Sequence, residues 1–555
     1  MFRRRDPQTT MFESGFLIPA AKAKRLRASW AHVFCTRALP LIDEDLFASL
    51  YCPDNGRPNR SVQTVMGVLI LKDIFNLTDE EALERLEFDL QWQYGLGLTP
   101  EEAHLPQKTL HNFRARMMDH EAGWLAFASV ADGVIGVLGT QVSRQRLDST
   151  QVMSNIAVLT RLGLFCETIR VFLSRLQQEH PRLYGHVPAG LVGRYLKDDG
   201  SPSGYQDARS ADGPRRLSVC ARDLYRLGHL FEGTAAQDLE AFGLLTRLLE
   251  EQCQVVDEKQ SPRKDDDDRG DGAVPVVLKD PKDVSPTSLQ SPHDPDATYS
   301  KRKGKGYEIQ VAETCHEDNV TEVITHVAVS PVCGQDAQAT VPALEDLAQR
   351  GQQPEELVAD TAYGSANNAL EAERMGAELV SPVAGSAPLP EPQVAPASRP
   401  LTATDFVVDA ALADPAVCPA GHFAVDQEAH QNKANCVELR FEAQTCEACP
   451  LFARCPAQLA ADGTAYGVSV DLGAANLERR RRAQADGTFQ ARYRIRAGIE
   501  ATNSELKRRH GLGELRVRGR PRVVLAVYLK AAACNVKRMV RALLPKPAAV
   551  AAATA

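Results

Sequence analysis

The stretch YEIQVAETCHEDNVTEVITHVAVS, residues 307–330, decides the fold class. It holds two runs of alternating apolar and polar residues, Tyr307–Cys315 and Glu322–Ser330, joined by the polar segment HEDNVT, and this predicts a β-hairpin. The residues that follow alternate between helical patterns and short apolar strands: helix 339–349, strand 356–360, helix 365–375 and strand 377–383. A hairpin followed by helix, strand, helix and strand indicates an α/β domain.

The overall composition is that of a globular protein with several domains. The chain has 555 residues, 44% of them hydrophobic and 25% charged, which allows two to four domains and excludes a fibrous or wholly disordered protein. The N-terminus has basic residues but no apolar run as long as that of a signal peptide. The most apolar C-terminal stretch, Val523–Cys534, is short and contains Lys530. We therefore expect a cytoplasmic protein that does not contact a membrane.

The charge is distributed unevenly along the chain. The net charge is −8, but residues 478–541 contain 18 Lys and Arg against five acidic residues. Such a basic stretch suits contacts with nucleic-acid phosphates. A solvated helical face that offsets acidic regions elsewhere is the alternative, and charge alone does not separate the two.

The N-terminal part of the chain is predicted to be helical. Apolar residues recur at helical spacing between about Leu41 and Met118, and Thr78–Glu81 has the form of a capping box. Pro106 can open a helix whose basic residues make it compatible with a helix-turn-helix-like DNA reader: Lys108, Arg114 and Arg116. Short basic helices are also common on protein surfaces that bind nothing.

Three acidic residues stand in contexts that suit metal-dependent chemistry. Glu500 lies in a predicted helix with Tyr493, Arg496 and Lys507 at offsets −7, −4 and +7, which at about 100° per residue places them on one stripe. Asp148 lies in RLDST, and Asp360 directly follows the apolar strand in LVADTAY. Taken singly, each Asp could instead be a helix N-cap or a turn former, and Glu500 could be half of a surface ion pair.

Together these motifs resemble the DDE transposases of bacterial insertion sequences, in the subgroup marked by a Tyr-x2-Arg-x3-Glu-x6-Lys signature. Residues 493–507, YRIRAGIEATNSELK, match every position of the signature. The family's first acid stands in an Asp-Ser/Gly-Thr motif, which residues 148–150 match, and its second in Ala-Asp-x2-Tyr-x-Ser, which residues 359–365 match. Asp294 and Asp296 could be mistaken for the first acid, but no strand pattern precedes them.

The resemblance implies an α/β fold with a ribonuclease-H-like catalytic core, a helical N-terminal domain, a long helical insertion and a Cys-rich insertion. The units expected in chain order are a DNA-binding domain at 1–130, first core segments at 140–160 and 296–384, a helical insertion at 161–255, a disordered linker at 256–295, a Pro-rich linker with the Cys-rich insertion at 385–477, and basic helices completing the core at 478–545. Strong helical patterns at 154–177 and 214–256 belong to the first insertion.

The resemblance also implies an activity, namely metal-dependent cleavage at transposon ends and strand transfer into target DNA, as in cut-and-paste transposition. Asp148, Asp360 and Glu500 would hold two Mg²⁺ or Mn²⁺ ions, since converging carboxylates repel one another unless cations neutralise them. Tyr493, Arg496 and Lys507 would bind DNA phosphates. The implied partners are double-stranded DNA, at the terminal inverted repeats and at the target, and at least a second copy of the chain; a nucleoid-associated location would follow.

The cysteines suggest a second, structural metal site. The chain has 13 Cys and no recognisable secretion signal, which favours reduced thiols over a disulfide framework. Four thiolates, or three with His422, could surround one Zn²⁺ ion. The candidate ligands are Cys418, Cys436, Cys446, Cys449 and Cys455. Unligated cytosolic thiols are the alternative.

Two other functions remain open from the sequence. One is a different ribonuclease-H-like nuclease, such as a junction resolvase, and the other is a catalytically inactive DNA-binding regulator derived from a transposase. The basic C-terminal helix and the N-terminal helical block favour the transposase over the nuclease. The presence of all three acids argues against the inactive regulator.

Overall fold

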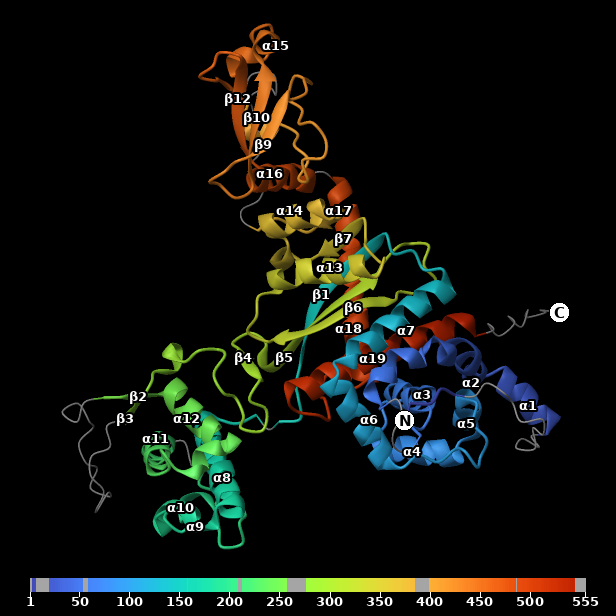
Figure 1. Cartoon of the computed structure of the whole chain (residues 1–555), viewed down its shortest axis with the longest axis vertical. Helices are drawn as coiled ribbons and strands as arrows, with labels where there is room; N and C mark the ends of the chain where they lie inside the picture. The colour runs from blue at the N-terminus through green and yellow to red at the C-terminus, as the bar shows by residue number, and fades with distance from the viewer. Residues whose placement is uncertain are drawn as a thin grey trace, which may run out of the picture.

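A six-stranded mixed sheet lies at the centre of the molecule (Figure 1). The computed structural model describes residues 2–5, 19–52, 58–156, 158–207, 212–256, 276–384, 399–485 and 487–544. Across the sheet the strands follow the order β6 (Ile324–Pro331), β5 (Gly304–Thr314), β1 (Arg144–Val152), β7 (Glu356–Ala359) and β8 (Glu378–Val380), and β4 (Thr298–Ser300) pairs with the start of β5.

The strand directions confirm the predicted α/β pattern. Strands β5 and β6 form an antiparallel hairpin, as residues 307–330 predict. Strand β1 is antiparallel to β5 and parallel to β7, which in turn is parallel to β8. Helix α13 (Thr340–Gln349) connects β6 to β7, on the other side of β5 and β1, and helix α14 (Ala366–Arg374) connects the parallel neighbours β7 and β8, which need a crossover connection.

The largest hydrophobic cluster joins the two ends of the chain to the sheet. Helices α7 (Ala122–Leu138) and α19 (Arg520–Leu543) pack against each other and against β6. The N-terminal helices that share this cluster are α2 (Trp30–Val33), α3 (Val62–Ile74), α4 (Asp79–Phe88), α5 (Leu90–Leu96) and α6 (Gln107–Asp119), and α1 (Ala20–Arg27) precedes them. The capping box at Thr78 is present as predicted. The N-terminal helices are thus continuous with the body of the protein.

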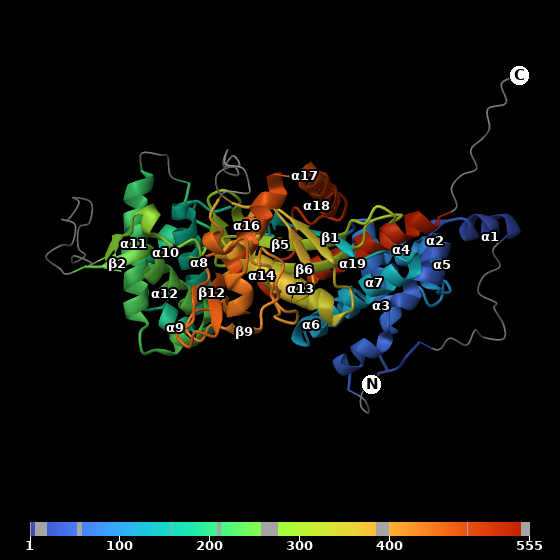
Figure 2. The same cartoon turned by 90° about the horizontal axis from the view of Figure 1, so that it is seen from above.

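Between β1 and β5 the chain forms a helical unit with a hydrophobic cluster of its own. Its helices are α8 (Arg161–Glu179), α9 (Pro181–Tyr184), α10 (Ala189–Tyr195), α11 (Gly213–Leu230) and α12 (Glu240–Gln252), and its strands β2 (Cys253–Val255) and β3 (Val276–Leu278) pair with each other. Figure 2 shows this unit and the N-terminal helices on opposite sides of the sheet.

The helix expected from Ser154 begins only at Arg161. Residues 153–155 instead bond to the segment that follows α18 (Ile499–Arg509): Met153 exchanges backbone hydrogen bonds with residues 513 and 515, and the Asn155 N–H donates to the Val517 carbonyl. Thr160 then caps α8 through its hydroxyl. The helical pattern of the sequence was overridden here because the backbone groups had partners in the tertiary structure.

The prediction of disorder for 256–295 is wrong for residues 276–295. This segment contains β3 and ends in a turn where Asp294 is fully buried and accepts a hydrogen bond from the Tyr307 hydroxyl. Its polar residues have partners on the helical unit; for example, the Leu289 N–H donates to Glu251. Composition suggested disorder because polar residues dominate, but Val276 and Leu289 are buried in the hydrophobic cluster of the helical unit and hydrogen bonds hold the polar groups of the segment. Residues 257–275 lie outside the described residues.

The cysteine-bearing segment forms a separate sheet that projects from the body, at the top of Figure 1. Its strands are β9 (Asp426–Ala429), β10 (Cys436–Glu442), β11 (Gln458–Leu459) and β12 (Ala465–Asp471), with α15 (Ala443–Glu447) at the tip and α16 (Leu472–Ala485) leading back to the core. The four strands follow the order β11-β12-β10-β9, and this unit has a hydrophobic cluster of its own. The linker expected from residue 385 lies, up to residue 398, outside the described residues.

No single helix in the described ranges is long and apolar enough to cross a membrane. Helices α6 and α7 reach that length and apolar character only when taken together, and they are bent by 96° relative to each other.

Candidate active site

Asp148 on β1 lies beside Asp360, which directly follows the neighbouring parallel strand β7. Leu147 on β1 is in register with Ala359 on β7, so the residues that follow them emerge at the same point of the sheet. Asp148 lies in the middle of β1, which continues to Val152 along β5. Only the pairing with β7 ends there, and both carboxylates lie within 4.0 Å of the Arg496 guanidinium.

Glu500 comes to the same place from the first turn of α18, which contacts β1. The sequence predicted one continuous helix through this region. The structure has α17 (Gly487–Tyr493), then a 3₁₀ segment, Arg494–Gly498, and then α18. Glu500 therefore begins a new helix, and its side chain is 71% exposed.

The break in the helix has a local cause in Arg146 of β1. The Arg146 Nη1 donates to the Ile495 carbonyl at 2.8 Å, which removes that carbonyl from a regular helical ladder. A Cβ atom at Gly498 would lie 2.1 Å from the same nitrogen, so only glycine permits this approach. The buried arginine therefore sets the position at which α18 starts.

Arg496 is the point at which the three acids meet. Its Nη2 lies 3.0 Å from Asp148 Oδ2 and 3.8 Å from Asp360 Oδ2, and its Nη1 lies 3.7 Å from Glu500 Oε1. The three predicted acids, distant in sequence, thus surround one guanidinium. The Arg496 Nε is buried and has no hydrogen-bond partner among the described residues.

The three carboxylates differ in their surroundings. Asp148 is 14% exposed, and burial raises its pKa above the ordinary value although the guanidinium of Arg496 opposes the shift. Asp360 also caps the turn that follows it, since the Ala362 N–H donates to its Oδ1 at 2.5 Å, which leaves Oδ2 toward Arg496. Both readings of Asp360, N-cap and site acid, are compatible with this geometry.

Two further residues of the signature flank the acids. Tyr493 ends α17, is half-buried and stacks on Phe489 with a ring-centroid distance of 5.7 Å. Burial raises the pKa of Tyr493, and Arg496 opposes this. Lys507 lies two turns beyond Glu500 on α18, half-buried, and burial lowers its pKa. In the part of the chain that the structure describes, its ammonium has no carboxylate within salt-bridge distance.

Behind the acids lies a buried charged network that the sequence did not reveal. Glu313 on β5 is fully buried and accepts two hydrogen bonds from Arg146, at 2.8 and 2.6 Å. Its other oxygen accepts from the Thr502 hydroxyl on α18 and from Arg538 on α19. The only usable sequence signal was the position of Arg146 two residues before Asp148, which puts both on one face of a strand.

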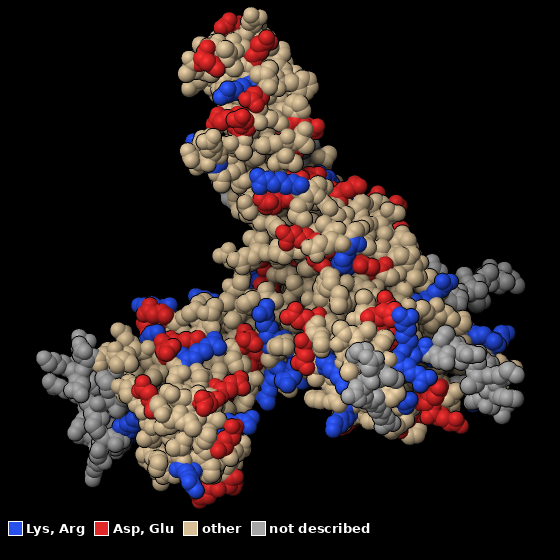
Figure 3. All heavy atoms as spheres, in the orientation of Figure 1, with Lys and Arg blue, Asp and Glu red and all other residues tan. Residues whose placement is uncertain are grey.

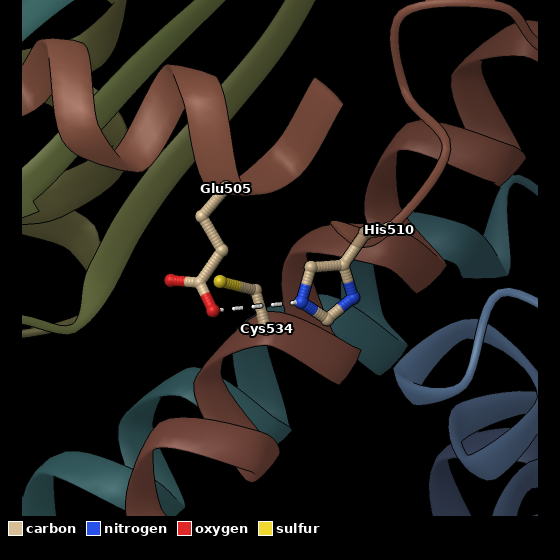
Figure 4. A group of neighbouring side chains, drawn as sticks. All are labelled: Glu505, His510 and Cys534. Carbon is tan, nitrogen blue, oxygen red and sulfur yellow. Dashed lines mark ion pairs between the residues drawn. The ribbon is translucent and has the colours of Figure 1, made fainter. Parts of the chain in front are cut away.

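A second polar group near α18 has the residue types of a metal site. The ligand atoms of Glu505, His510 and Cys534 lie within 4.8 Å of one another (Figure 4). However, Lys537 Nζ lies 3.5 Å from Glu505 and 3.4 Å from His510 Nε2. Burial and the Lys537 charge lower the pKa of His510 to about 4. We read the group as a buried ion-pair network, since the ammonium occupies the approach to both ligands.

The structure brings four of the five candidate zinc ligands to one cavity at the tip of the projecting sheet. Cys418, Cys446, Cys449 and Cys455 line it together with His422. Burial raises the pKa of Cys446 to about 11, with the three other thiols adding to the shift. Cys436 is not part of the cluster, because it starts β10 opposite Asp471, at the far end of that strand from α15. Its inclusion was wrong.

The basic residues of α6 are not equivalent. Arg114 binds both carboxylate oxygens of Asp79 at the start of α4, so its guanidinium serves the fold. Its contact with DNA stays a prediction. Arg116 is exposed but stacks over the Tyr51 ring at 5.0 Å. Lys108 is exposed.

A further basic strip was not singled out from the sequence. Residues at alternating positions before and within the start of α19 are all exposed: Arg516, Arg518, Arg520 and Arg522. Lys and Arg gather on the lower body, beside the gap between the helical unit and the N-terminal helices, in the region where α19 begins (Figures 1 and 3). The alternating Arg pattern, visible in RVRGRPR, was the signal for the strip.

The carboxylates of Asp148, Asp360 and Glu500 form a donor set that fits a divalent cation. Hard oxygen ligands from three elements converge on one positive charge, which is the arrangement that Mg²⁺ or Mn²⁺ binding needs.

Comparison with known families gives two matches. A family model described as a transposase DDE domain matches residues 417–540, which include Arg496 and Glu500. A model described as a transposase domain matches residues 29–116, which run from α2 into α6. No curated protein and no solved structure matches the chain. The two matches, one in the N-terminal and one in the C-terminal part of the chain, support a DDE transposase of the insertion-sequence type.

Proposed function

We propose that this transposase cleaves DNA at the ends of its element and joins them to target DNA, with Asp148, Asp360 and Glu500 as the metal-binding acids. The observation that carries the proposal is the convergence of the three carboxylates on Arg496. DDE transposase domains use divalent metal ions. When bound, such ions activate a water or a DNA 3′-hydroxyl and stabilise the leaving oxygen at phosphorus.

The chain's own residues would fix the geometry of this reaction. Asp148 is carried by β1, Asp360 directly follows β7, and Glu500 lies in the first turn of α18, whose start is set by Arg146. A site on regular elements holds its ligands more firmly than a site on loops. Tyr493 and Lys507, beside the acids, would contact the DNA phosphates near the cut.

The strand order is compatible with a ribonuclease-H-like core, in which the first strand lies between an antiparallel and a parallel neighbour. On this proposal residues 161–255 and 385–477 are insertions into the core, and the N-terminal part, residues 1–130, binds DNA through Lys108 and Arg116. The exposed strip from Arg516 to Arg522 is a further phosphate-binding surface. The chain would act in the cytoplasm, on the nucleoid, as at least a dimer.

The alternatives are a nuclease without strand transfer and an inactive regulator. The presence of the three carboxylates in one place favours an active enzyme over the regulator. Cut-and-paste transposition and simple nicking differ only in the fate of the cut ends, so an assay must follow both.

Replacing Asp360 with Ala should abolish cleavage while leaving binding of the element's ends nearly intact. Asp360 is 41% exposed at the surface of the site, so its loss should not disturb the core. The measurement is cleavage and joining of a labelled duplex that carries the inverted repeats, in Mg²⁺ and in Mn²⁺, beside a gel-shift assay. Retained cleavage would remove Asp360 from the catalytic set. Cleavage without joining by the unaltered chain would favour the nuclease.

We propose in addition that Cys418, Cys446, Cys449 and Cys455 bind one structural Zn²⁺. Two backbone N–H groups point at these sulfurs, from His422 to Cys418 at 3.3 Å and from Leu451 to Cys449 at 3.4 Å, and such donors favour thiolates. The thiols are spaced more widely than the ligand atoms of the group in Figure 4. Binding of the ion would draw the segment around Cys418 and the segment from Cys446 to Cys455 together.

Purified chain should then contain one zinc ion per molecule. Cys449→Ser should remove it, because a closed tetrahedral site needs all four ligands. Cys436→Ser is the matched control, since that thiol lies away from the cavity, and it should keep the zinc. Metal analysis of the three proteins decides, and a zinc-free unaltered chain would contradict the proposal.

A further inference from the structure

We propose that Arg496 is an electrostatic latch: it neutralises the three acids before DNA binds and leaves them when a DNA phosphate takes it up, so that metal loading is coupled to DNA binding. The inference rests on the proposed function, because it concerns the same acids. It assigns to Arg496 a role beyond contact with DNA.

The position of Arg496 is incompatible with metal ions on the same oxygens. Its two terminal nitrogens lie within 4.0 Å of one oxygen from each of the three carboxylates. A Mg²⁺ ion held about 2.1 Å from those oxygens would lie close to the guanidinium, and both are positively charged. In a partly buried site such repulsion is screened less than in water. The guanidinium and the ions therefore compete for the acids.

The contacts of Arg496 are those of a group that can leave. Only the 3.0 Å contact with Asp148 is within hydrogen-bond range, and the contacts at 3.7 and 3.8 Å are held by charge alone. The buried Nε has no partner among the described residues. A phosphate accepts two parallel hydrogen bonds from a guanidinium and would satisfy it better.

Arg146, the other arginine of the site, provides the contrast. Its Nε and Nη2 both donate to Glu313 and its Nη1 donates to the Ile495 carbonyl, so the whole guanidinium is engaged. Its side chain is 7% exposed, against 20% for Arg496. One arginine is thus fixed and the other is held loosely. Arg496 also lies in the 3₁₀ segment between α17 and α18, where a short non-α stretch can act as a hinge.

The test measures Mn²⁺ binding by the full-length chain, with electron paramagnetic resonance of free Mn²⁺ as the readout. Without DNA, Arg496→Gln should bind Mn²⁺ at least about tenfold more tightly than the unaltered chain, because the competing charge is gone. When a DNA duplex is added, the Mn²⁺ affinity of the unaltered chain should rise by about the same factor, while that of Arg496→Gln should rise little. Mn²⁺ bound by DNA itself is subtracted using the complex of the Asp148→Asn variant.

The matched control is Arg494→Gln, which removes one positive charge from an exposed position in the same 3₁₀ segment. It should keep the Mn²⁺ affinity of the unaltered chain without DNA. Equal or weaker Mn²⁺ binding by Arg496→Gln, with Asp148-dependent binding in the unaltered chain, would overturn the latch and leave the metal site standing. Absence of Asp148-dependent Mn²⁺ binding in every variant, with and without DNA, would overturn both.

Discussion

Asp148→Asn is expected to reduce DNA cleavage by at least about a thousandfold, which corresponds to roughly 4 kcal/mol of transition-state stabilisation. The substitution keeps the shape of the side chain and removes its charge. Asp148 is the most buried of the three acids and the one nearest to Arg496, so its charge has the least solvent to replace it. Cleavage of a labelled transposon end in Mn²⁺, measured as a single-turnover rate, gives the factor.

The control for Asp148 is the other aspartate that could be taken for the first acid. Asp294 is fully buried, but it binds the Tyr307 hydroxyl in the turn before β4 and contacts none of the three acids. Asp294→Asn should therefore keep cleavage within about threefold, provided that its thermal unfolding shows a folded protein. Cleavage lost in folded Asp294→Asn and kept in Asp148→Asn would reverse the assignment.

The sequence predicted the parts of the site that depend on local patterns. The hairpin at 307–330 and the strand before Asp360 follow from alternation and are present, and the helix predicted around Glu500 is present from Ile499 onward. The convergence of the acids required a resemblance, because nothing in the spacing of residues 148, 360 and 500 specifies that β1 pairs with β7.

The errors share one physical origin, which is competition from tertiary contacts. Arg146 interrupts a helix that is regular by its own sequence, and residues 153–155 pair with a distant segment instead of starting α8. Asp294 and its neighbours are polar and still buried, because Tyr307 and the helical unit supply partners. Secondary-structure propensity describes a segment in isolation. A distant part of the chain that hydrogen-bonds to the backbone of that segment, or buries its charge, outweighs the propensity.

Glu313→Ala is expected to destabilise the core around the site by about 3–5 kcal/mol. Glu313 is the shared acceptor of Arg146, Thr502 and Arg538, and none of its side chain is exposed. Its removal would leave two buried guanidinium groups without this carboxylate, and the loss of one partner from a buried ion pair costs this much. Glu317→Ala, in the exposed turn of the same hairpin, should cost less than about 0.5 kcal/mol.

The measurement must be local, because a chain with several hydrophobic clusters does not unfold in one step. Hydrogen exchange of the β1 and α18 amides reports the opening of this region alone, and its protection should fall in Glu313→Ala and not in Glu317→Ala. A loss confined to α19 would mean that Arg538 alone depends on Glu313. A loss in both β1 and α18 would mean that one buried carboxylate holds the strand of Asp148 against the helix of Glu500. In that case cleavage by Glu313→Ala should fall at temperatures where the chain is still folded, since the distance between two of the three acids would no longer be fixed.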